Sequence, residues 1–347
     1  MDKKNYVSID VMKFICAILI ISLHTGPFAT YNKYISFLNR NILTIIAVPF
    51  FFIASSFLFF KKAIPLDNKI KNTLFLRFTK RISVMYIIWS AIYFIFVVQK
   101  WVSRGWTLNA ILLYIRDFFF VGSYETIWFL PALLSATAIV FYLLKIIKIN
   151  SILIISFVFY AFALLGSSYH GITTNIPFLD NCYDIYFNAF TTIKNGLFFG
   201  FPYVAIGAFI AQYEFKLVSK NNIFYAILFS FLMVVEEIFL TKFKLETNGV
   251  DTKLFLLPVS FFLFMIVVNI KLPDNLNYKM FRDLSLLMFL SQRLFLTILP
   301  NLLHNIGFGV LIDNSIAFFA IILISTIFFS YLIILLSNKI KFFKLLL

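Results

Sequence analysis

Charged side chains are scarce in this sequence. They make up 13% of the 347 residues, while hydrophobic residues make up 62%. A soluble globular protein has about 25% charged and about 45–50% apolar residues. A membrane-spanning helix needs about 20 mostly apolar residues, so the composition has room for roughly ten such helices and little else. The scarcity of charge therefore excludes a soluble enzyme, a soluble nucleic-acid-binding protein and a disordered chain.

Cysteine, histidine and acidic residues are also few. The two cysteines, Cys16 and Cys182, lie far apart in the sequence, so we expect no disulfide framework. The three histidines show no metal-ligand spacing, and we expect no metal site. Acidic residues number 15 against 30 basic ones, a net charge of +15. In a protein with many membrane helices such an excess is typical of cytoplasmic loops, so it indicates a lipid bilayer and not nucleic acid as the partner.

The apolar runs predict an all-α, polytopic membrane protein with about ten transmembrane helices. We expect one membrane domain over residues 1–347 and three larger outer segments, near 100–125, 167–195 and 241–253. The predicted helices cover residues 8–24, 41–60, 82–99, 126–147, 150–166, 196–213, 221–240, 254–271, 283–300 and 315–337.

Lysine and arginine are distributed unevenly between alternate connecting segments. With the N-terminus inside, nineteen basic residues fall on the inner side and nine on the outer side. The inner set includes Lys3, Lys4, Lys216 and Lys220, whereas Lys253 is counted as an outer-loop charge. Because basic residues accumulate in cytoplasmic loops, both termini are expected in the cytoplasm. The predicted location is the inner or plasma membrane of a bacterium.

The first predicted helix carries three ionisable residues, Asp10, Lys13 and His24. At about 100° per residue, Lys13 and His24 lie within about 20° of one another around the helix, and Asp10 lies about 40° from His24. Ionisable groups inside a membrane are costly and mark candidate functional sites. A histidine there could remove a proton from a hydroxyl group, or it could only hydrogen-bond a neighbouring helix. Asp10 and Lys13 could equally form a simple ion pair at the membrane surface.

These residues resemble the first helix of the membrane acyltransferase type 3 family, in which a basic residue precedes a histidine as Lys13 precedes His24. Further similarity follows in chain order along residues 5–300. Trp128 opens a motif similar to the start of the family's fourth helix. Two later motifs are similar to the membrane domain of vancomycin-resistance-type serine racemases, of the same family, whose racemase domain we expect to be absent here. The similar segments are Ala47–Ser56, Arg77–Ile82, Trp128–Ala132, Gly166–Gly171 and Lys194–Phe199.

The sequence departs from the family pattern at four positions. Ser56 stands where a glycine is usual, and Lys80 stands where many members carry arginine. Thr126 and Gln292 occupy positions where histidines are expected. These departures concern the acceptor side more than His24, and they leave room for a member that has lost acyl transfer.

The resemblance implies an O-acyltransferase that moves an acyl group, commonly acetyl, from acetyl-coenzyme A or another acyl-coenzyme A to a glycan or glycolipid acceptor. No tightly bound cofactor is expected. In this interpretation His24 is the general base. Lys13 would orient a donor phosphate or position the helix through Asp10. Arg77, Lys80 and Arg81 would bind the coenzyme's phosphates, although ordinary cytoplasmic loop charge would also explain them.

The remaining candidates are less specific. Glu236 or Glu237 could be the partner of His24, with the other reaching the membrane interface. Arg293 could stabilise a developing oxyanion, but a buried ion pair with one of those glutamates is the favoured interpretation. His170 is expected to be a solvated loop residue. Substrate contacts are assigned to Asp10, Trp128, Tyr169 and Asn195.

A transporter or permease-like domain for a small solute such as an amino acid is the alternative function. Intramembrane Asp, Lys, His and Glu serve ion-coupled transporters as well as enzymes. The sequence shows no inverted repeat and no matched pair of Gly/Pro-broken helices, which are typical of many transporters. We therefore expect the enzyme.

Overall fold

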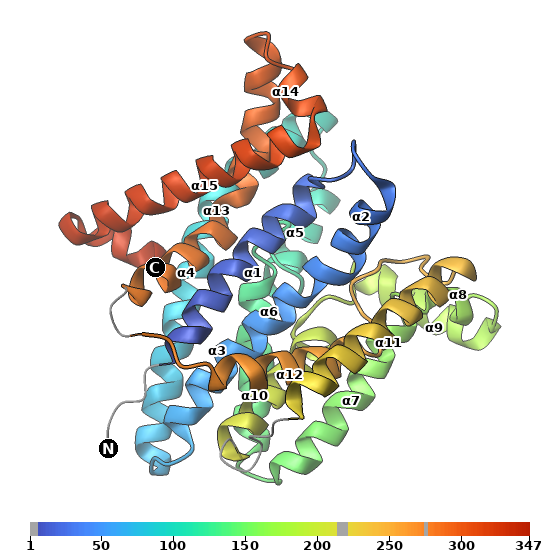
Figure 1. Ribbon diagram of the computed structural model, residues 1–347, viewed down its shortest axis with the longest axis vertical. Coiled ribbons are helices and arrows are strands. Elements are labelled where there is room, and N and C mark those ends of the chain that lie inside the picture. Colours follow the sequence, from blue (N-terminus) through green and yellow to red (C-terminus); the bar gives the residue numbers. More distant parts are fainter. Residues whose placement is uncertain (1–5, 214–220, 274–276) are drawn as a thin grey trace. The chain divides into compact units, whose positions relative to one another are not determined.

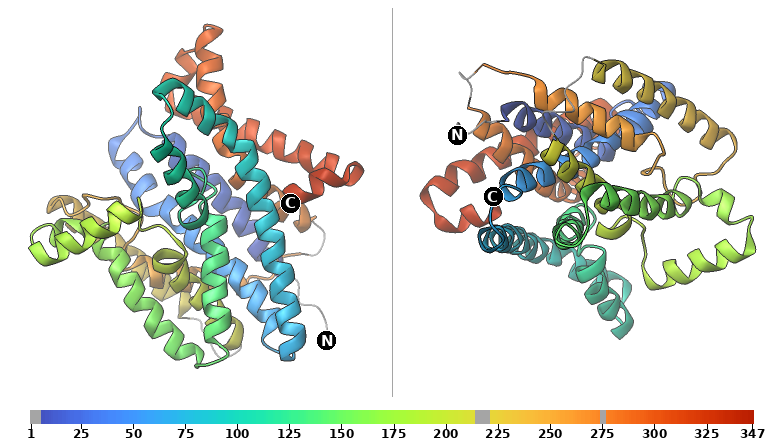
Figure 2. Two further views of the ribbon diagram at one scale, coloured as in Figure 1. Left: turned by 180° about the vertical axis from the view of Figure 1, so that it is seen from behind. Right: turned by 90° about the horizontal axis from the view of Figure 1, so that it is seen from below.

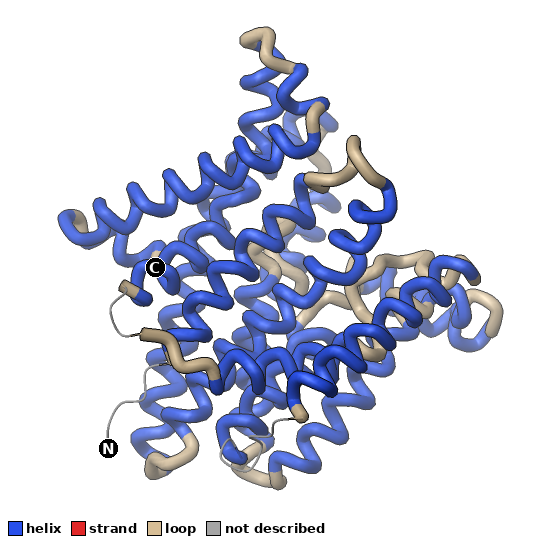
Figure 3. Tube along the Cα trace, in the orientation of Figure 1, coloured by secondary structure: helices blue, strands red, loops and turns tan. Residues whose placement is uncertain are grey.

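The computed structural model describes residues 6–213, 221–273 and 277–347, and in this part of the chain the regular structure is entirely helical (Figure 3). Lys3, Lys4, Lys216 and Lys220, which entered the topology prediction, lie outside the described residues. Each of the ten predicted ranges contains a helix. These helices are α1 (Val7–Thr25), α3 (Ala47–Ala63), α4 (Asn68–Arg104), α6 (Phe129–Leu143), α7 (Ile149–Leu165), α10 (Phe201–Tyr213), α11 (Asn222–Lys242), α12 (Leu256–Asn269), α13 (Tyr278–Asn305) and α15 (Ser315–Lys339).

Seven helical segments among the described residues are long and apolar enough to cross a membrane. The other three, α6, α7 and α12, are apolar but have only 15, 17 and 14 residues. At about 1.5 Å per residue, 15 residues rise about 22 Å, which is less than the hydrocarbon thickness of about 30 Å. The all-α, polytopic membrane architecture is confirmed, while the orientation of the termini stays a prediction.

Two of the segments expected as outer loops contain helices. The segment 100–125 holds the end of α4 and the helix α5 (Leu108–Phe120), which folds back along α4 (Figure 2). The ring of Tyr114 lies 5.5 Å from Phe94 and 5.6 Å from Trp101. The shorter elements are α2 (Lys33–Leu38), η1 (Asn39–Leu43), η2 (Thr44–Ile46), α8 (His170–Thr173), α9 (Pro177–Ala189), η3 (Gly196–Gly200), α14 (Val310–Asp313) and η5 (Lys341–Leu346).

The chain forms two compact units: unit 1 comprises Met1–Phe51 and Leu263–Leu347, and unit 2 comprises Phe52–Phe262. In unit 1, α1 packs along α13, and α15 packs on both (Figure 1). The Phe14 and Phe281 rings meet edge to face at 5.3 Å between α1 and α13. Beyond the end of α1, the hydroxyls of Thr30 and Ser315 lie 2.8 Å apart and join this connection to the start of α15.

Unit 2 contains a close-packed centre formed by α6, α7, η3 and α10. Glycine allows the backbones to approach there: a Cβ atom at Gly196 would lie 2.6 Å from the carbonyl oxygen of Ala132. A Cβ atom at Gly207 would lie 2.6 Å from the carbonyl oxygen of Ile53 on α3. The side chain that faces Gly207 is Ser56, so a small side chain stands opposite the glycine at this contact.

Candidate functional site

The three ionisable residues of the first helix lie on one continuous helix, α1, as predicted. The helix's buried side chains include Cys16 and Ala17, both 0% exposed. Cys16 is three residues from Lys13, and Ala17 is four, so these residues share a face of about 100° around the helix. The Lys13–His24 face is therefore the face that α1 turns toward the protein interior, and Ile15 on the opposite side is exposed.

Charged residues gather at the N-terminal end of this face. Asp10 interacts electrostatically with Lys13 on its own helix and with Arg282 and Asp283 on α13. Arg282 also donates a hydrogen bond from Nε to Asp283 at 3.2 Å. Because opposite charges are balanced across two packed helices, the predicted Asp10–Lys13 interaction is part of a four-residue cluster and not an isolated pair.

His24 lies in the last turn of α1 and is exposed to solvent. The helix ends at Gly26, which adopts a left-handed conformation (φ 58°) and donates its backbone N–H to the carbonyl of Ser22. Only glycine takes this conformation without steric cost. The imidazole is therefore exposed at a sharply defined helix end, while the rest of its helix face is buried or half-buried.

The helix α13 carries the other candidates of unit 1. Ser291 and Gln292 are both 0% exposed, and the Gln292 side chain donates a hydrogen bond to the carbonyl of Phe289 at 3.1 Å. Within the described residues the Ser291 hydroxyl and the Gln292 Oε1 atom have no hydrogen-bond partner. Arg293 follows them and is half-buried. Unpaired buried polar atoms are uncommon in proteins and mark places where a ligand or water binds.

Glu236 and Glu237 lie near the C-terminal end of α11 and are 6% and 0% exposed. Both side chains are therefore buried in protein, and the expectation that one of them reaches the membrane interface stays a prediction. The Glu236 carboxylate accepts hydrogen bonds from the Tyr169 hydroxyl at 2.7 Å and from backbone N–H groups that precede α12, Leu254 at 2.6 Å and Phe255 at 3.0 Å. These N–H groups would otherwise be unpaired at a helix start, so Glu236 holds α11, α12 and Tyr169 together.

Glu237 forms an ion pair with Lys253, whose ammonium group also contacts Glu246 at 3.0 Å. Lys253 lies in the connection between α11 and α12 yet is fully buried, so it is not a solvated loop charge, while its position on the outer side of the membrane stays a prediction. The sequence offered no signal for this, because Lys253 directly precedes an apolar run and resembles an ordinary flanking lysine. Two carboxylates around one ammonium make a buried cluster that clamps the 243–255 segment to α11.

Tyr169 and His170 lie at the start of α8 in the same unit. Burial raises the pKa of Tyr169, and the hydrogen bond to the Glu236 carboxylate raises it further. His170 is half-buried: its Nδ1 lies 2.9 Å from the Thr247 hydroxyl, and its ring packs on Tyr183 and Phe187. The expectation of a solvated loop histidine is therefore wrong, because the 243–255 segment covers this side chain.

Trp128 and Asn195 flank the centre of unit 2. The Trp128 ring lies 6.2 Å from Phe52 and 5.7 Å from Phe199. The Asn195 side chain accepts hydrogen bonds from the N–H groups of Leu197 and Phe198 and donates one to the Tyr186 hydroxyl. Asn195 thus caps η3, a structural role that uses both ends of its amide, and its predicted substrate contact stays a prediction.

Arg77, Lys80 and Arg81 are exposed and lie within α4, which begins nine residues before Arg77 at Asn68. The prediction placed them in a connection before a helix starting at residue 82, so that boundary is wrong. The hydrophobic run is preceded by a helical extension that is amphipathic: Phe75 stacks on Phe141 of α6 at 4.1 Å, while the basic residues lie on other faces of the helix.

An apolar cavity of about 580 Å³ lies in unit 2 between α7, α10, α11 and α12. Its lining is almost wholly hydrophobic and includes Phe157, Phe229 and Phe261. Tyr160 also lines it, but its hydroxyl is used in hydrogen bonds to the Lys253 carbonyl and the Tyr203 hydroxyl. Such a cavity suits a hydrocarbon chain.

Comparison with known proteins gives one family and several relatives. The family described as "Acyltransferase domain" matches residues 6–335. The chain is 28% identical over 269 residues to an amino-acid racemase of Enterococcus faecalis, covering 77% of this chain and 36% of the relative. A second amino-acid racemase of Enterococcus faecalis is 25% identical over 340 residues, covering 97% of this chain and 47% of the relative. A serine/alanine racemase of Enterococcus gallinarum is 23% identical over 262 residues, covering 75% and 37%.

The chain thus spans less than half the length of these curated relatives. No solved structure matches it.

Proposed function

Because this chain belongs to the acyltransferase 3 family, we propose that it is a membrane O-acyltransferase that moves an acyl group, most simply acetyl, from a coenzyme A thioester to a hydroxyl. The proposed acceptor is a cell-surface glycan or a lipid-linked sugar. The observation that carries the proposal is the arrangement of α1, where His24 is exposed at the end of an inward-facing side that also bears the half-buried Lys13 and Asp10.

His24 has the role of general base in this proposal. The imidazole takes the proton of the acceptor hydroxyl while the hydroxyl oxygen bonds to the thioester carbonyl carbon. The carbon–sulfur bond then breaks, and the sulfur leaves with its electron pair and receives the proton from the imidazolium. Because His24 lies in the last turn of α1, the negative end of the helix dipole stabilises the positive charge that the base acquires.

The other candidate residues have supporting roles in this proposal. Arg293 is the proposed donor to the oxyanion of the tetrahedral intermediate. Asp10 and Lys13 hold α1 on α13 through the charges of Arg282 and Asp283. Glu236 already accepts three hydrogen bonds, so we assign it to positioning Tyr169 and α12 and not to the proton transfer.

A lipid-linked acceptor is supported by the apolar cavity of about 580 Å³ in unit 2. A hydrocarbon tail in this cavity would hold its polar head near the level of the segment 243–255, which carries the half-buried Glu246. Each buried methylene contributes about 0.8 kcal/mol, so a tail supplies affinity that a free sugar lacks.

The test is acyl transfer by the purified protein in nanodiscs. It uses acetyl-coenzyme A labelled in the acetyl group, total glycolipid as acceptor, and the variants His24→Ala and His24→Gln. Loss of general-base catalysis lowers kcat by a factor of about 10²–10⁴, with the KM for the thioester unchanged. A wild-type protein that transfers no label and binds no acetyl-coenzyme A would refute the proposal.

A second candidate is transport of a small solute such as an amino acid. It is supported by the relatives, which are named as amino-acid and serine/alanine racemases. Uptake of labelled serine and alanine into liposomes that contain the protein distinguishes this function, because an acyltransferase gives no time-dependent accumulation.

A further inference from the structure

A second cavity, of about 390 Å³, lies in unit 2 between the C-terminal end of α3, the first turns of α4 and the C-terminal end of α6. The topology prediction puts these helix ends on the cytoplasmic side. Polar and apolar groups share its lining, unlike the lining of the apolar cavity. The side chains used below are Phe60, Asn68, Lys71, Asn72, Phe141 and Lys145.

The floor of this cavity is aromatic and buried, and its rim is polar. Phe60 and Phe141 are 1% and 3% exposed. Phe141 is held by the stacked ring of Phe75 at 4.1 Å, with an angle of 5° between the planes. Asn68, Asn72 and Lys145 at the rim are exposed, and Lys71 is half-buried.

Lys145 is held in a defined position at the rim. Its ammonium group donates a hydrogen bond to Asn72 Oδ1 at 3.1 Å and lies 4.8 Å from the ring centres of both Phe141 and Tyr142. Together with Lys71 it gives the lining two positive charges, and among the described residues that line the cavity there is no Asp or Glu. Two ammonium groups above an aromatic floor, with carboxamides beside them, can bind phosphate groups and a flat ring at once.

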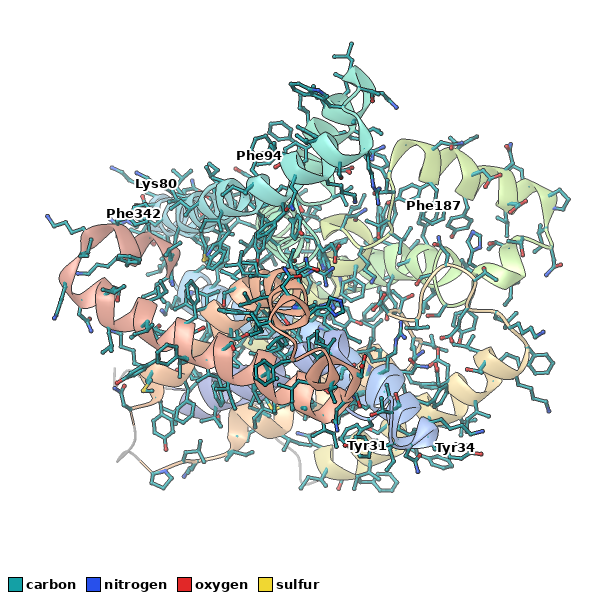
Figure 4. The ribbon with its side chains drawn as sticks, turned by 90° about the horizontal axis from the view of Figure 1, so that it is seen from above. Tyr31, Tyr34, Lys80, Phe94, Phe187 and Phe342 are labelled. Atoms are coloured by element: carbon teal, nitrogen blue, oxygen red, sulfur yellow. The ribbon has the colours of Figure 1, made fainter. Side chains whose placement is uncertain are left out.

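Arg77 and Lys80, which the sequence analysis proposed as phosphate-binding residues, do not lie on the side of α4 that carries Phe75. Arg77 follows Phe75 by two residues and therefore lies about 200° from it around the helix. Lys80 follows Phe75 by five residues, about 140° away. Both are exposed, and Lys80 points away from the helix into solvent (Figure 4).

We propose that this cavity binds the phosphorylated nucleotide end of the acyl donor, with its phosphates at Lys71 and Lys145 and its base against Phe60 and Phe141. The inference deepens the proposed acyltransferase function, because it names the donor's binding residues. It also replaces the predicted Arg77–Lys80–Arg81 cluster as the donor's main phosphate site. The volume of about 390 Å³ falls within the range of about 300–1,000 Å³ that small-molecule sites have.

The test measures binding of adenosine 3′,5′-bisphosphate to the full chain in nanodiscs of neutral lipid. The Lys71→Gln/Lys145→Gln variant is compared with the control Arg77→Gln/Lys80→Gln, which removes the same net charge but from α4 alone. Because each lost charge-assisted hydrogen bond weakens binding by about tenfold or more, we expect Kd to rise at least tenfold in the first variant and less than about threefold in the control. The Lys71→Arg/Lys145→Arg variant keeps the charges and should bind within about threefold of wild type.

Three results would overturn the proposal: equal weakening in both Gln variants, a larger effect in the control, or bisphosphate binding by the wild type that is no tighter than binding of inorganic phosphate. Competition by phosphatidylglycerol that abolishes nucleotide binding would also overturn it, in favour of a lipid headgroup site. Failure of this proposal can be told apart from failure of the proposed function. If the Lys71→Gln/Lys145→Gln variant still shows His24-dependent acyl transfer with an unchanged KM for the thioester, the protein is an acyltransferase but this cavity does not bind its donor.

Discussion

The buried Lys253 makes a sharp prediction about stability. Its side chain is 0% exposed, and that of its partner Glu237 is 1% exposed. Replacing Lys253 by Met keeps the length of the side chain but leaves the Glu237 carboxylate without its ammonium partner. Breaking a buried ion pair on one side costs about 3–5 kcal/mol, because an uncompensated charge remains in a medium of low polarity.

Replacing both partners tests whether the cost comes from the stranded charge. In Lys253→Met/Glu237→Gln no buried charge is left from the pair, and Glu246, whose side chain is 11% exposed, can take up a proton. We expect the double variant to recover at least half of the stability lost by Lys253→Met, which gives a coupling energy of about 2 kcal/mol or more.

The assay is unfolding by SDS titration in mixed micelles, followed by tryptophan fluorescence. The matched control is Lys242→Met, which removes an exposed lysine eleven residues earlier, at the end of α11. Its loss should be about 0–1 kcal/mol. The reasoning is refuted if Lys253→Met and Lys242→Met lose the same stability, or if the double variant loses the sum of its two single variants.

Three further predictions follow from packing, capping and titration. Gly207→Val should destabilise by about 1–3 kcal/mol or more in the same titration, because its Cβ would lie 2.6 Å from a carbonyl oxygen of α3; unfolding like wild type would contradict the close approach. Asn195→Ala should cost about 0.5–2 kcal/mol through loss of the η3 cap, and Asn195→Asp should recover most of it. Burial raises the pKa of Glu246 above 4.5, so the folded state binds this proton more tightly than the unfolded state, and stability falls as pH rises through the folded-state pKa. The melting temperature of Glu246→Gln relative to that of wild type should therefore increase as pH rises above 4.5. A difference that does not change with pH would show that titration of Glu246 does not affect stability.

Features that depend on residues of one helix could be predicted from the sequence, whereas contacts between residues far apart in the sequence could not. The face shared by Lys13 and His24 could be predicted, because helix periodicity alone fixes the angle between two residues of one helix. The sequence also pointed to Arg77 and Arg81 as donor-binding residues, but it could not say which side of α4 meets α6. That choice depends on the stacking of Phe75 on Phe141, a contact between residues 66 positions apart.

The sequence by itself determined that this is a helical membrane protein, where its main helices lie, and that it belongs to a family of acyltransferases. Each of these follows from composition, apolar run length or short motifs, which are properties of neighbouring residues. Only the tertiary structure decided which charged side chains are buried and which partners they have. Lys253 lies in the connection between α11 and α12, as the sequence predicts, but only the structure shows that it is fully buried between Glu237 and Glu246. The physical reason is that the free energy of a charge depends on what surrounds it, and the partners of Lys253 come from two elements that only the fold of α11 and the 243–255 segment brings together.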